Sequence, residues 1–216
     1  MVDADFVQLL PMKPNEMSLN RFSIHVLSCF DPDNISIRQT SLDPIPDYIS
    51  GAVERDAIAQ VCELPDSELR IGYYYAAKIN GIWERVQLLG PSSINSHCMR
   101  VYLVDIGSFG ITYKDKIRHL KLASGLRKIM MAKCKVSGIK PDKSSDTWSR
   151  ESQLFMERLV CDAKKVEMEP CSEWIEYRSG SGNELLPHVP FVSANIYIDN
   201  ADLAECLVHN GYAVRI

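Results

Sequence analysis

The sequence predicts a mainly β protein with a few helices, an α+β fold built around a small barrel. Five short strand patterns separated by tight turns fill the segment 72–120, and short strands at this spacing are typical of a strongly bent barrel. A further hairpin pattern precedes this segment at 22–39, and helical periodicity marks 46–62 and 149–161. The barrel is therefore expected between two other stretches of ordered chain.

Local residue types predict the turns and the helix ends. Asp31-Pro32-Asp33-Asn34 favours a type I turn inside the first hairpin, and Asn80-Gly81 favours a two-residue hairpin. Pro65 stops the first helix, and Asn200 can cap a last helix at 201–209. Further strands are expected at 73–79, 82–89, 99–104, 109–113, 132–136, 165–169, 173–178 and 190–198, with 165–169 and 173–178 paired to each other.

Composition excludes several classes of protein. The chain has 216 residues, of which 46% are hydrophobic and 24% charged, and this balance argues against disorder. Its formal net charge of −4 speaks against a general nucleic-acid binder, because such proteins are usually basic. No apolar run approaches the roughly 18 residues of a membrane helix, and the first ten residues do not read as a signal peptide.

No pattern in the sequence points to a metal, a cofactor or a catalytic group. The seven cysteines are widely spaced and form no C-x-x-C pair, so we expect buried, reduced thiols in a reducing compartment. No histidine has an evident carboxylate or cysteine partner, and no ordered set of carboxylates suits phosphodiester cleavage. A non-enzymatic protein without a cofactor is expected.

Charge is unevenly distributed along the chain. Residues 1–69 carry a net charge of −8, residues 70–122 a net charge of +5, and residues 123–216 a net charge of −1. The acidic first third could complement the basic middle within the molecule, or it could offer an acidic surface to a basic partner. The sequence leaves both arrangements open.

The middle of the chain carries several motifs in a fixed order. They are Gly72-Tyr-Tyr-Tyr-Ala-Ala77, Trp83-Glu-Arg85-Val, Val101-Tyr-Leu-Val-Asp105-Ile-Gly107-Ser108, Lys116-Ile-Arg118-His-Leu120, and Gly138-Ile139-Lys-Pro141 followed by Trp148. This order resembles the extended Tudor domain of germline Tudor proteins and of the staphylococcal-nuclease-like Tudor protein. The resemblance implies an extended lead-in at 1–20, a Tudor barrel at 70–122, and a split nuclease-like OB fold at 21–69 and 123–216 that includes a linking helix.

In that family a cage of four aromatic side chains beside an asparagine binds methylated arginine. Each ring attracts the cation by about 0.5–2 kcal/mol. Carried over onto this sequence, the four cage positions and the asparagine fall, in order, on Lys78 or Ile79, Glu84, Leu103, Ile106 and Ser108. None of these residues is aromatic, so the chain resembles a cage-deficient member of the family, such as those in insect Krimper-type proteins.

This resemblance implies an adaptor or scaffold of the PIWI–piRNA silencing pathway, located in the cytoplasm at perinuclear germ granules (nuage). Its expected partners are the arginine-containing tail of a PIWI-type Argonaute and other Tudor or scaffold proteins. Glu84 and Asp105 would pair with an unmodified guanidinium, whose five donors suit bidentate bonds. Methylation removes donors, so such a site would prefer bare arginine. Asp56 and Glu63, on the linking helix, would add acidic contacts.

Several of these assignments have an alternative. Asp105 in a turn is more often a structural residue that accepts hydrogen bonds from nearby backbone N–H groups. Glu84 could be a solvated strand residue, and Phe109, just after the turn, could supply one ring at the cage positions.

The function has two alternatives as well. They are a vestigial Tudor face used for self-association and an OB-type RNA-binding module, of which the acidic net charge disfavours the second.

Overall fold

The computed structural model describes residues 7–43, 45–121, 128–142, 146–177 and 186–216. These residues belong to two compact units, and the chain passes between them several times. One unit comprises 1–12, 42–130 and 178–188, and the other comprises 13–41, 131–177 and 189–216. The predicted division at 1–20, 21–69, 70–122 and 123–216 stays a prediction.

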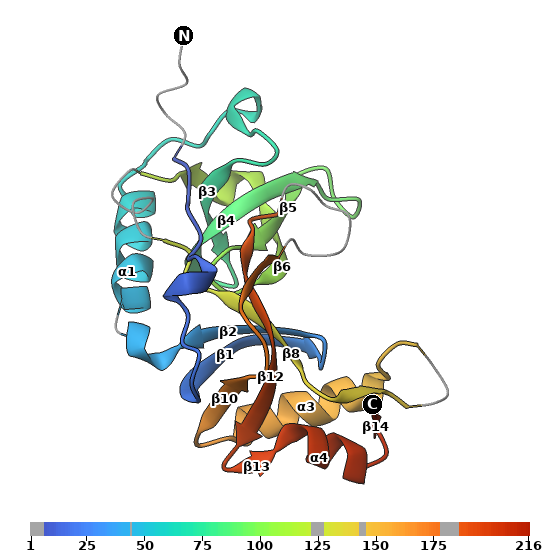
Figure 1. Ribbon diagram of the computed structural model, residues 1–216. Helices are drawn as coiled ribbons and strands as arrows, with labels where there is room; N and C mark the ends of the chain where they lie inside the picture. Colours follow the sequence, from blue (N-terminus) through green and yellow to red (C-terminus); the bar gives the residue numbers. More distant parts are fainter. Residues whose placement is uncertain (1–6, 44, 122–127, 143–145, 178–185) are drawn as a thin grey trace. The chain divides into compact units, whose positions relative to one another are not determined.

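A five-stranded antiparallel sheet forms the barrel of the first unit (Figure 1). Its strands are β3 (Tyr74–Ile79), β4 (Ile82–Pro91), β5 (Cys98–Leu103), β6 (Ser108–Tyr113) and β7 (Ile117–His119), in the order β6-β5-β4-β3-β7. Thr112 Oγ1 donates to the Lys78 carbonyl oxygen at 2.9 Å, which ties β6 to β3 and closes the barrel. The small barrel predicted at 72–120 is confirmed.

Alternate apolar side chains fill the interior of this barrel. Successive residues of a strand point to opposite faces, so every second residue faces inward. The buried cluster consists of Tyr75, Ala77, Val86, Leu88, Met99, Val101, Leu103 and Ile117, with Leu64, Leu69, Ile79 and Ile106 packed against it. At the predicted hairpin, Asn80 and Gly81 have φ of 49° and 90°, the positive values that a two-residue type I′ turn needs.

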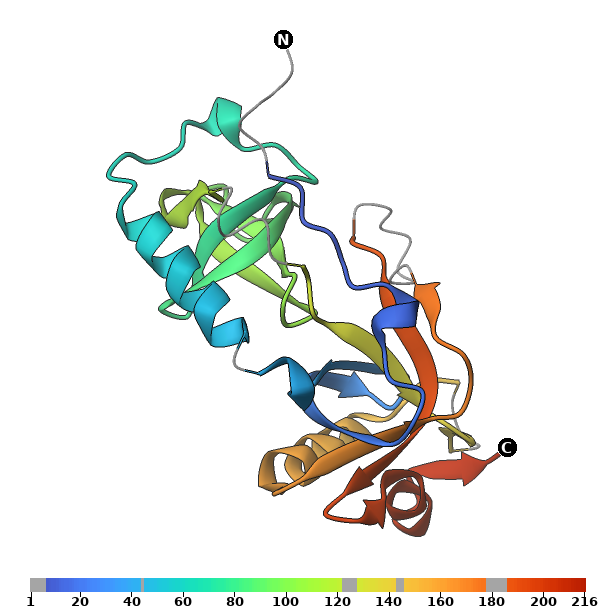
Figure 2. The ribbon, with the colours of Figure 1, turned by 60° about the vertical axis from the view of Figure 1, so that its left-hand side comes forward.

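The helix α1 (Ile45–Ile58) packs on β4 of the barrel (Figure 2). It ends at Ile58, earlier than the predicted 62, so Glu63, which was expected on this helix, lies five residues beyond its end. The Gln60 side chain donates to the His119 carbonyl oxygen at 2.9 Å and accepts from the His119 N–H at 3.1 Å. Because Gln60 pairs with the backbone of β7, the chain leaves the helical path before the predicted end.

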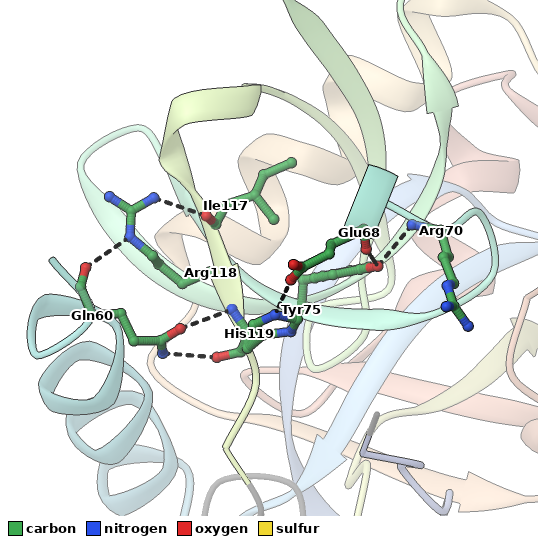
Figure 3. A network of polar contacts seen from close by, with 7 residues as sticks. All are labelled: Gln60, Glu68, Arg70, Tyr75, Ile117, Arg118 and His119. Carbon is green, nitrogen blue, oxygen red and sulfur yellow. Dashed lines mark hydrogen bonds and ion pairs between the residues drawn. The ribbon is translucent and has the colours of Figure 1, made fainter. Parts of the chain in front are cut away.

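A set of hydrogen bonds fastens the segment 60–70 to the barrel (Figure 3). The Tyr75 hydroxyl donates to the Glu68 carbonyl oxygen at 2.6 Å and accepts from the Arg70 N–H at 2.8 Å. The Glu68 carboxylate lies 2.8 Å from His119 Nε2. The strands β3 and β7 are therefore held by residues that precede the barrel in the sequence.

In the second unit five strands close into a ring (Figure 1). They are β1 (Phe22–Asp31), β2 (Asn34–Gln39), β8 (Ala132–Val136), β12 (Val189–Ile198) and β10 (Val166–Pro170), and β10 also pairs with β1. Only the β8–β12 pair of this ring is parallel. The helix α3 (Arg150–Asp162) packs on β1, and α4 (Leu203–His209) packs on β12.

This ring agrees with the prediction of a second barrel that is split in the sequence by the insertion of the first. Its first two strands precede the first barrel in the sequence, and its last three follow it. The β2–β8 pair joins the two parts, with Ile35 opposite Cys134. The remaining short elements are η1 (Pro14–Glu16), η2 (Thr40–Leu42), η3 (Asp66–Glu68), η4 (Lys114–Lys116), β9 (Ile139–Pro141), β11 (Ile175–Tyr177), β13 (Ala201–Asp202) and β14 (Ala213–Arg215).

The pairing predicted between 165–169 and 173–178 is wrong. The strands found there, β10 and β11, each pair with β12 in the described structure. Local sequence signals cannot identify a partner strand that follows later in the chain, so the adjacent strand was the simplest expectation.

The cap predicted for the last helix is also wrong. Asp202 is the N-cap of α4, and its Oδ1 accepts from the Ala204 N–H at 2.7 Å. Asp199 and Asn200 instead have positive φ, 49° and 71°, and connect β12 to β13 as a hairpin. Asn200 is thus used for its tolerance of the left-handed conformation, not for its capping oxygen.

The cysteines differ from expectation in their burial. All seven are free thiols, and Cys98 and Cys134 are buried, whereas Cys62, Cys161 and Cys171 are exposed. Within the described ranges, no helix is long and apolar enough to cross a membrane. The same ranges hold no cluster of three or more His, Cys, Asp or Glu side chains suited to a metal ion.

The isolated segment 70–122 is predicted not to fold by itself. It lacks the partners of Tyr75 and His119 on residues 60–70, and it lacks α1, which covers β4. We expect a collapsed proton NMR spectrum or aggregation for 70–122 and a well-dispersed spectrum for the full chain. A soluble, monomeric 70–122 with dispersed amide shifts would contradict this prediction.

Candidate functional site

The turn between β5 and β6 carries several of the predicted site residues. The N–H groups of Gly107 and Ile106 both donate to the Leu103 carbonyl oxygen, at 2.8 and 3.3 Å. Gly107 has φ of 78°, a left-handed value that glycine adopts without strain. This tight turn folds Ile106 back against the barrel core.

Arg85 and Asp105 form a bidentate ion pair at this turn. Arg85 Nε donates to Asp105 Oδ2 at 2.7 Å, and Nη2 donates to Asp105 Oδ1 at 2.5 Å and to the Lys128 carbonyl oxygen at 3.1 Å. The Arg85 side chain is 0% exposed, and that of Asp105 is 24% exposed. Asp105 is thus the counter-ion of a buried guanidinium, and its contact with a peptide stays a prediction.

Glu84 lies next to this pair without bonding to it. It is half-buried, on the strand face that also carries Val86 and Leu88, and its carboxyl makes no hydrogen bond or ion pair with any residue in the described part of the chain. Burial and, next, the charge of Asp105 raise the pKa of Glu84 to about 7, although Arg85 acts in the opposite direction. An unpaired carboxyl in such a place can accept a cation.

Apolar side chains lie at the same end of the barrel. A Cβ atom on Gly110 would lie 2.9 Å from Leu103 Cδ1 and 3.8 Å from Ile79 Cδ1, so both side chains reach the inner face of β6. Leu103 is buried, and Ile79 and Ile106 pack against the core. The absence of a side chain at Gly110 leaves Leu103 the room that it occupies.

The strand register places Glu84 among these apolar groups. Ala77 is opposite Glu84, and Val86 is opposite Leu103. Ile79 and Leu103 are therefore diagonal neighbours of Glu84 on the inward face, within reach of long side chains. Ser108 is opposite Leu103 on β6. We call Ile79, Glu84, Leu103, Ile106 and Ser108 the barrel mouth.

Two other predicted residues lie on the outward face of the sheet. Lys78, one of the two candidates for the first cage position, is exposed and lies opposite Trp83. The other candidate, Ile79, lies on the inward face. Phe109 is 61% exposed, and its ring packs edge-on against that of Tyr102, with the ring centroids 5.3 Å apart. Phe109 thus supplies no ring to the barrel mouth in this structure.

The two acidic residues expected to flank the site have other neighbours in the structure. Asp56 is half-buried on α1, with its Oδ1 4.0 Å from Lys121 Nζ. Glu63 is exposed and lines a cavity of about 830 Å³ together with Lys114, whereas Glu84 is not part of that lining. Their part in binding stays a prediction.

The sequence patterns do not single out two residues that shape the barrel mouth. The partner of Arg85 is 20 positions away, so the ion pair depends on the folded barrel. A charged residue inside a largely apolar strand pattern is the one signal that could have identified Arg85. No signal marks Gly110, because its role depends on the position of Leu103.

The sequence model of the Tudor domain matches residues 18–138. The chain belongs to the Tudor domain family. The matched residues include all five strands of the first barrel and also β1, β2, α1 and β8. Tudor domains are non-catalytic binding modules, so the prediction that the chain is not an enzyme is confirmed.

This Tudor domain has a relative in Caenorhabditis elegans. It is 34% identical over 213 residues to the protein tag-250, an overlap that covers 95% of the chain and 33% of tag-250. The chain therefore spans about a third of the curated relative that it matches.

Solved structures of extended Tudor domains have the same fold. The human TDRD1 domain, in complex with a symmetrically dimethylated peptide, superposes with a TM-score of 0.77 at 16% identity and covers 100% of this chain and 99% of its own. A mouse TDRD1 domain, with a MILI peptide containing dimethylarginine, gives 0.75 at 13% identity and covers 97% and 100%.

A third structure holds a different peptide. It is a variant of the Drosophila melanogaster Papi extended Tudor domain in complex with an unmethylated Piwi N-terminal peptide. It superposes with a TM-score of 0.72 at 14% identity and covers 91% of this chain and 99% of its own. The predicted extended Tudor fold is confirmed by these superpositions.

Removing the Asp105 carboxylate is predicted to destabilise this Tudor domain strongly. Asp105→Ala would leave the buried Arg85 guanidinium without a counter-ion, which typically costs about 3–5 kcal/mol. The control is Asp115→Ala, because the Asp115–Lys116 pair is exposed and such pairs contribute about 0–1 kcal/mol. Urea unfolding of the three proteins measures both values. Equal, small losses in the two variants would contradict the assigned role of Asp105.

Proposed function

We propose that this Tudor domain is a non-catalytic adaptor that binds an arginine-containing peptide at the barrel mouth and prefers unmodified arginine to symmetric dimethylarginine. The observation that carries the proposal is Glu84, a half-buried carboxyl without a bonded partner among the described residues. A guanidinium could donate two hydrogen bonds to its two oxygens. Such bonds to a charged group contribute about 1.5–3 kcal/mol.

The apolar residues of the barrel mouth support the stated preference. Ile79, Leu103 and Ile106 can pack against the methylene groups of an arginine, but they carry no ring face for a cation. Methyl groups on the guanidinium remove N–H donors, and here no aromatic ring offsets that loss. The net effect of methylation is therefore expected to be neutral or unfavourable.

The peptides bound by similar structures support the ligand class. The TDRD1 domains were solved with dimethylated peptides and the Papi domain with an unmethylated Piwi peptide. We propose the N-terminal tail of a PIWI-type Argonaute as the partner. Such a partner would place the protein in the piRNA pathway, at perinuclear germ granules in the cytoplasm.

Other predicted residues enter this proposal as supporting contacts. Asp105 is 24% exposed and could accept a further hydrogen bond beside its two from Arg85. Ser108 could hydrogen-bond the peptide from the start of β6. Asp56 and Glu63 would add long-range attraction for a basic tail.

Matched peptides test the proposal by calorimetry. The unmodified arginine peptide is expected to bind at least as tightly as its dimethylarginine form, and Glu84→Gln is expected to weaken binding about tenfold or more, because the loss is about 1.5–3 kcal/mol. Glu54→Gln, which changes an exposed residue of α1, should leave the affinity unchanged.

Two outcomes would contradict the proposal. Tenfold tighter binding of the dimethylarginine peptide would mean that other aromatic residues form a displaced cage. Unchanged binding by folded Glu84→Gln would exclude Glu84 as the acceptor. A double Asp56→Lys/Glu63→Lys variant that binds as well as the parent would remove only these two supporting contacts.

Self-association is a second candidate function, favoured by the outer face of β6. Alternate residues of this strand, Phe109, Ile111 and Tyr113, are 61%, 47% and 57% exposed. A row of exposed apolar residues favours contact with other proteins. Sedimentation equilibrium is expected to show association that Ile111→Lys abolishes. A parent protein that stays monomeric at high concentration would exclude this candidate.

A further inference from the structure

We infer that the barrel mouth exchanges a proton for its cationic ligand, so that arginine binding releases the proton of Glu84 and strengthens as pH rises through neutrality. This inference rests on the proposed function and adds a regulation of the same site. It concerns Glu84 alone, because the neighbouring carboxylate is already bonded to Arg85.

Asp105 and Glu84 differ in the hydrogen bonds that their carboxyl groups accept. Each Asp105 oxygen accepts a hydrogen bond from Arg85, at 2.7 and 2.5 Å, so both oxygens of this carboxylate already have a donor. Glu84 is half-buried on the inward face and has no such donor in the described ranges. A carboxyl with reduced contact to water and without a hydrogen-bond donor favours its neutral, protonated form.

The groups around Glu84 reinforce this difference. Asp105 from the turn opposes the negative charge of an ionised Glu84, and Arg85 from β4 favours it, with the effect of Asp105 the larger of the two. The inward neighbours on β3, β5 and β6 are apolar or uncharged: Ala77, Ile79, Leu103, Ser108 and Gly110. Burial is the largest cause of the resulting pKa of about 7, and Asp105 is the next.

A bound guanidinium favours the ionised form of Glu84, because its N–H groups supply the hydrogen-bond donors that this carboxyl lacks. Below the pKa of Glu84 the ligand must displace a proton, which passes to the buffer, and above this pKa the carboxylate is already free. With a pKa of about 7, the binding-competent fraction is about a tenth at pH 6 and about nine tenths at pH 8. The apparent affinity is then expected to rise about tenfold over this range.

The test uses the full chain and an unmodified arginine peptide without histidine. Calorimetry at pH 6, 7 and 8, in two buffers with different ionisation heats, gives both the dissociation constant and the number of protons released. The expected result is about tenfold tighter binding at pH 8 than at pH 6, with close to one proton released at pH 6. Glu84→Gln should bind weakly with no pH dependence, and Glu54→Gln should behave as the parent.

Two measurements without ligand test the protonation of Glu84 directly. The carboxyl carbon of Glu84, assigned by comparison with Glu84→Gln, should titrate near pH 7 in NMR spectra. Since the folded state holds this proton more tightly than the unfolded state, the parent loses stability as pH rises from about 4.5 to 7. The melting temperature of Glu84→Gln should therefore exceed that of the parent increasingly over this window and stay higher at pH 8.

The outcomes distinguish the two proposals. No binding of any arginine peptide from pH 6 to 8 would refute the proposed function, and the inference with it. Binding with equal affinity at pH 6 and 8 and without proton release would refute the inference alone. A Glu84 carboxyl that titrates near its ordinary value of 4.5 would refute the inference whether or not the peptide binds.

Discussion

The structure of the barrel mouth depends on the ion pair between Arg85 and Asp105. A guanidinium that is 0% exposed needs a carboxylate, and Asp105 provides it with both oxygens. The pair fixes the turn after β5 and thereby the position of Ile106 against the core. It also neutralises the buried guanidinium next to Glu84. Among the residues that the structure describes, the Glu84 carboxyl has no ion-pair partner, and in the proposed function a ligand cation fills this place.

A site of this kind selects its ligand differently from an aromatic cage. Ring faces attract a cation whether or not methyl groups cover its N–H donors, with about 0.5–2 kcal/mol for each ring. A carboxylate instead depends on those donors, so its contribution falls when they are replaced by methyl groups. The side chains Ile79, Leu103 and Ile106 add apolar contact but no preference for charge. In the proposed function, discrimination between bare and methylated arginine would therefore depend on Glu84.

The sequence predicted local elements well and long-range pairings less well. Asn80-Gly81 identified its hairpin because the turn needs positive φ at both residues. The expected cage positions lie at one end of the barrel because the strand pairing brings them together, and their part in binding stays a prediction. The end of α1 was misplaced because Gln60 bonds to β7, and Asn200 was misassigned because β13 pairs with β12. The ion pair of Arg85 was missed for the same reason, since it forms only in the folded barrel.

The central claim is that an arginine side chain of the ligand lies against the apolar residues of the barrel mouth and beside Glu84. Isotope-filtered NMR spectra of the complex test this directly. The account predicts intermolecular NOEs from the arginine methylene protons to the methyl groups of Ile79, Leu103 and Ile106. NOEs from the same protons to the outward side chains Phe109 and Tyr113, without any to the three mouth residues, would contradict it.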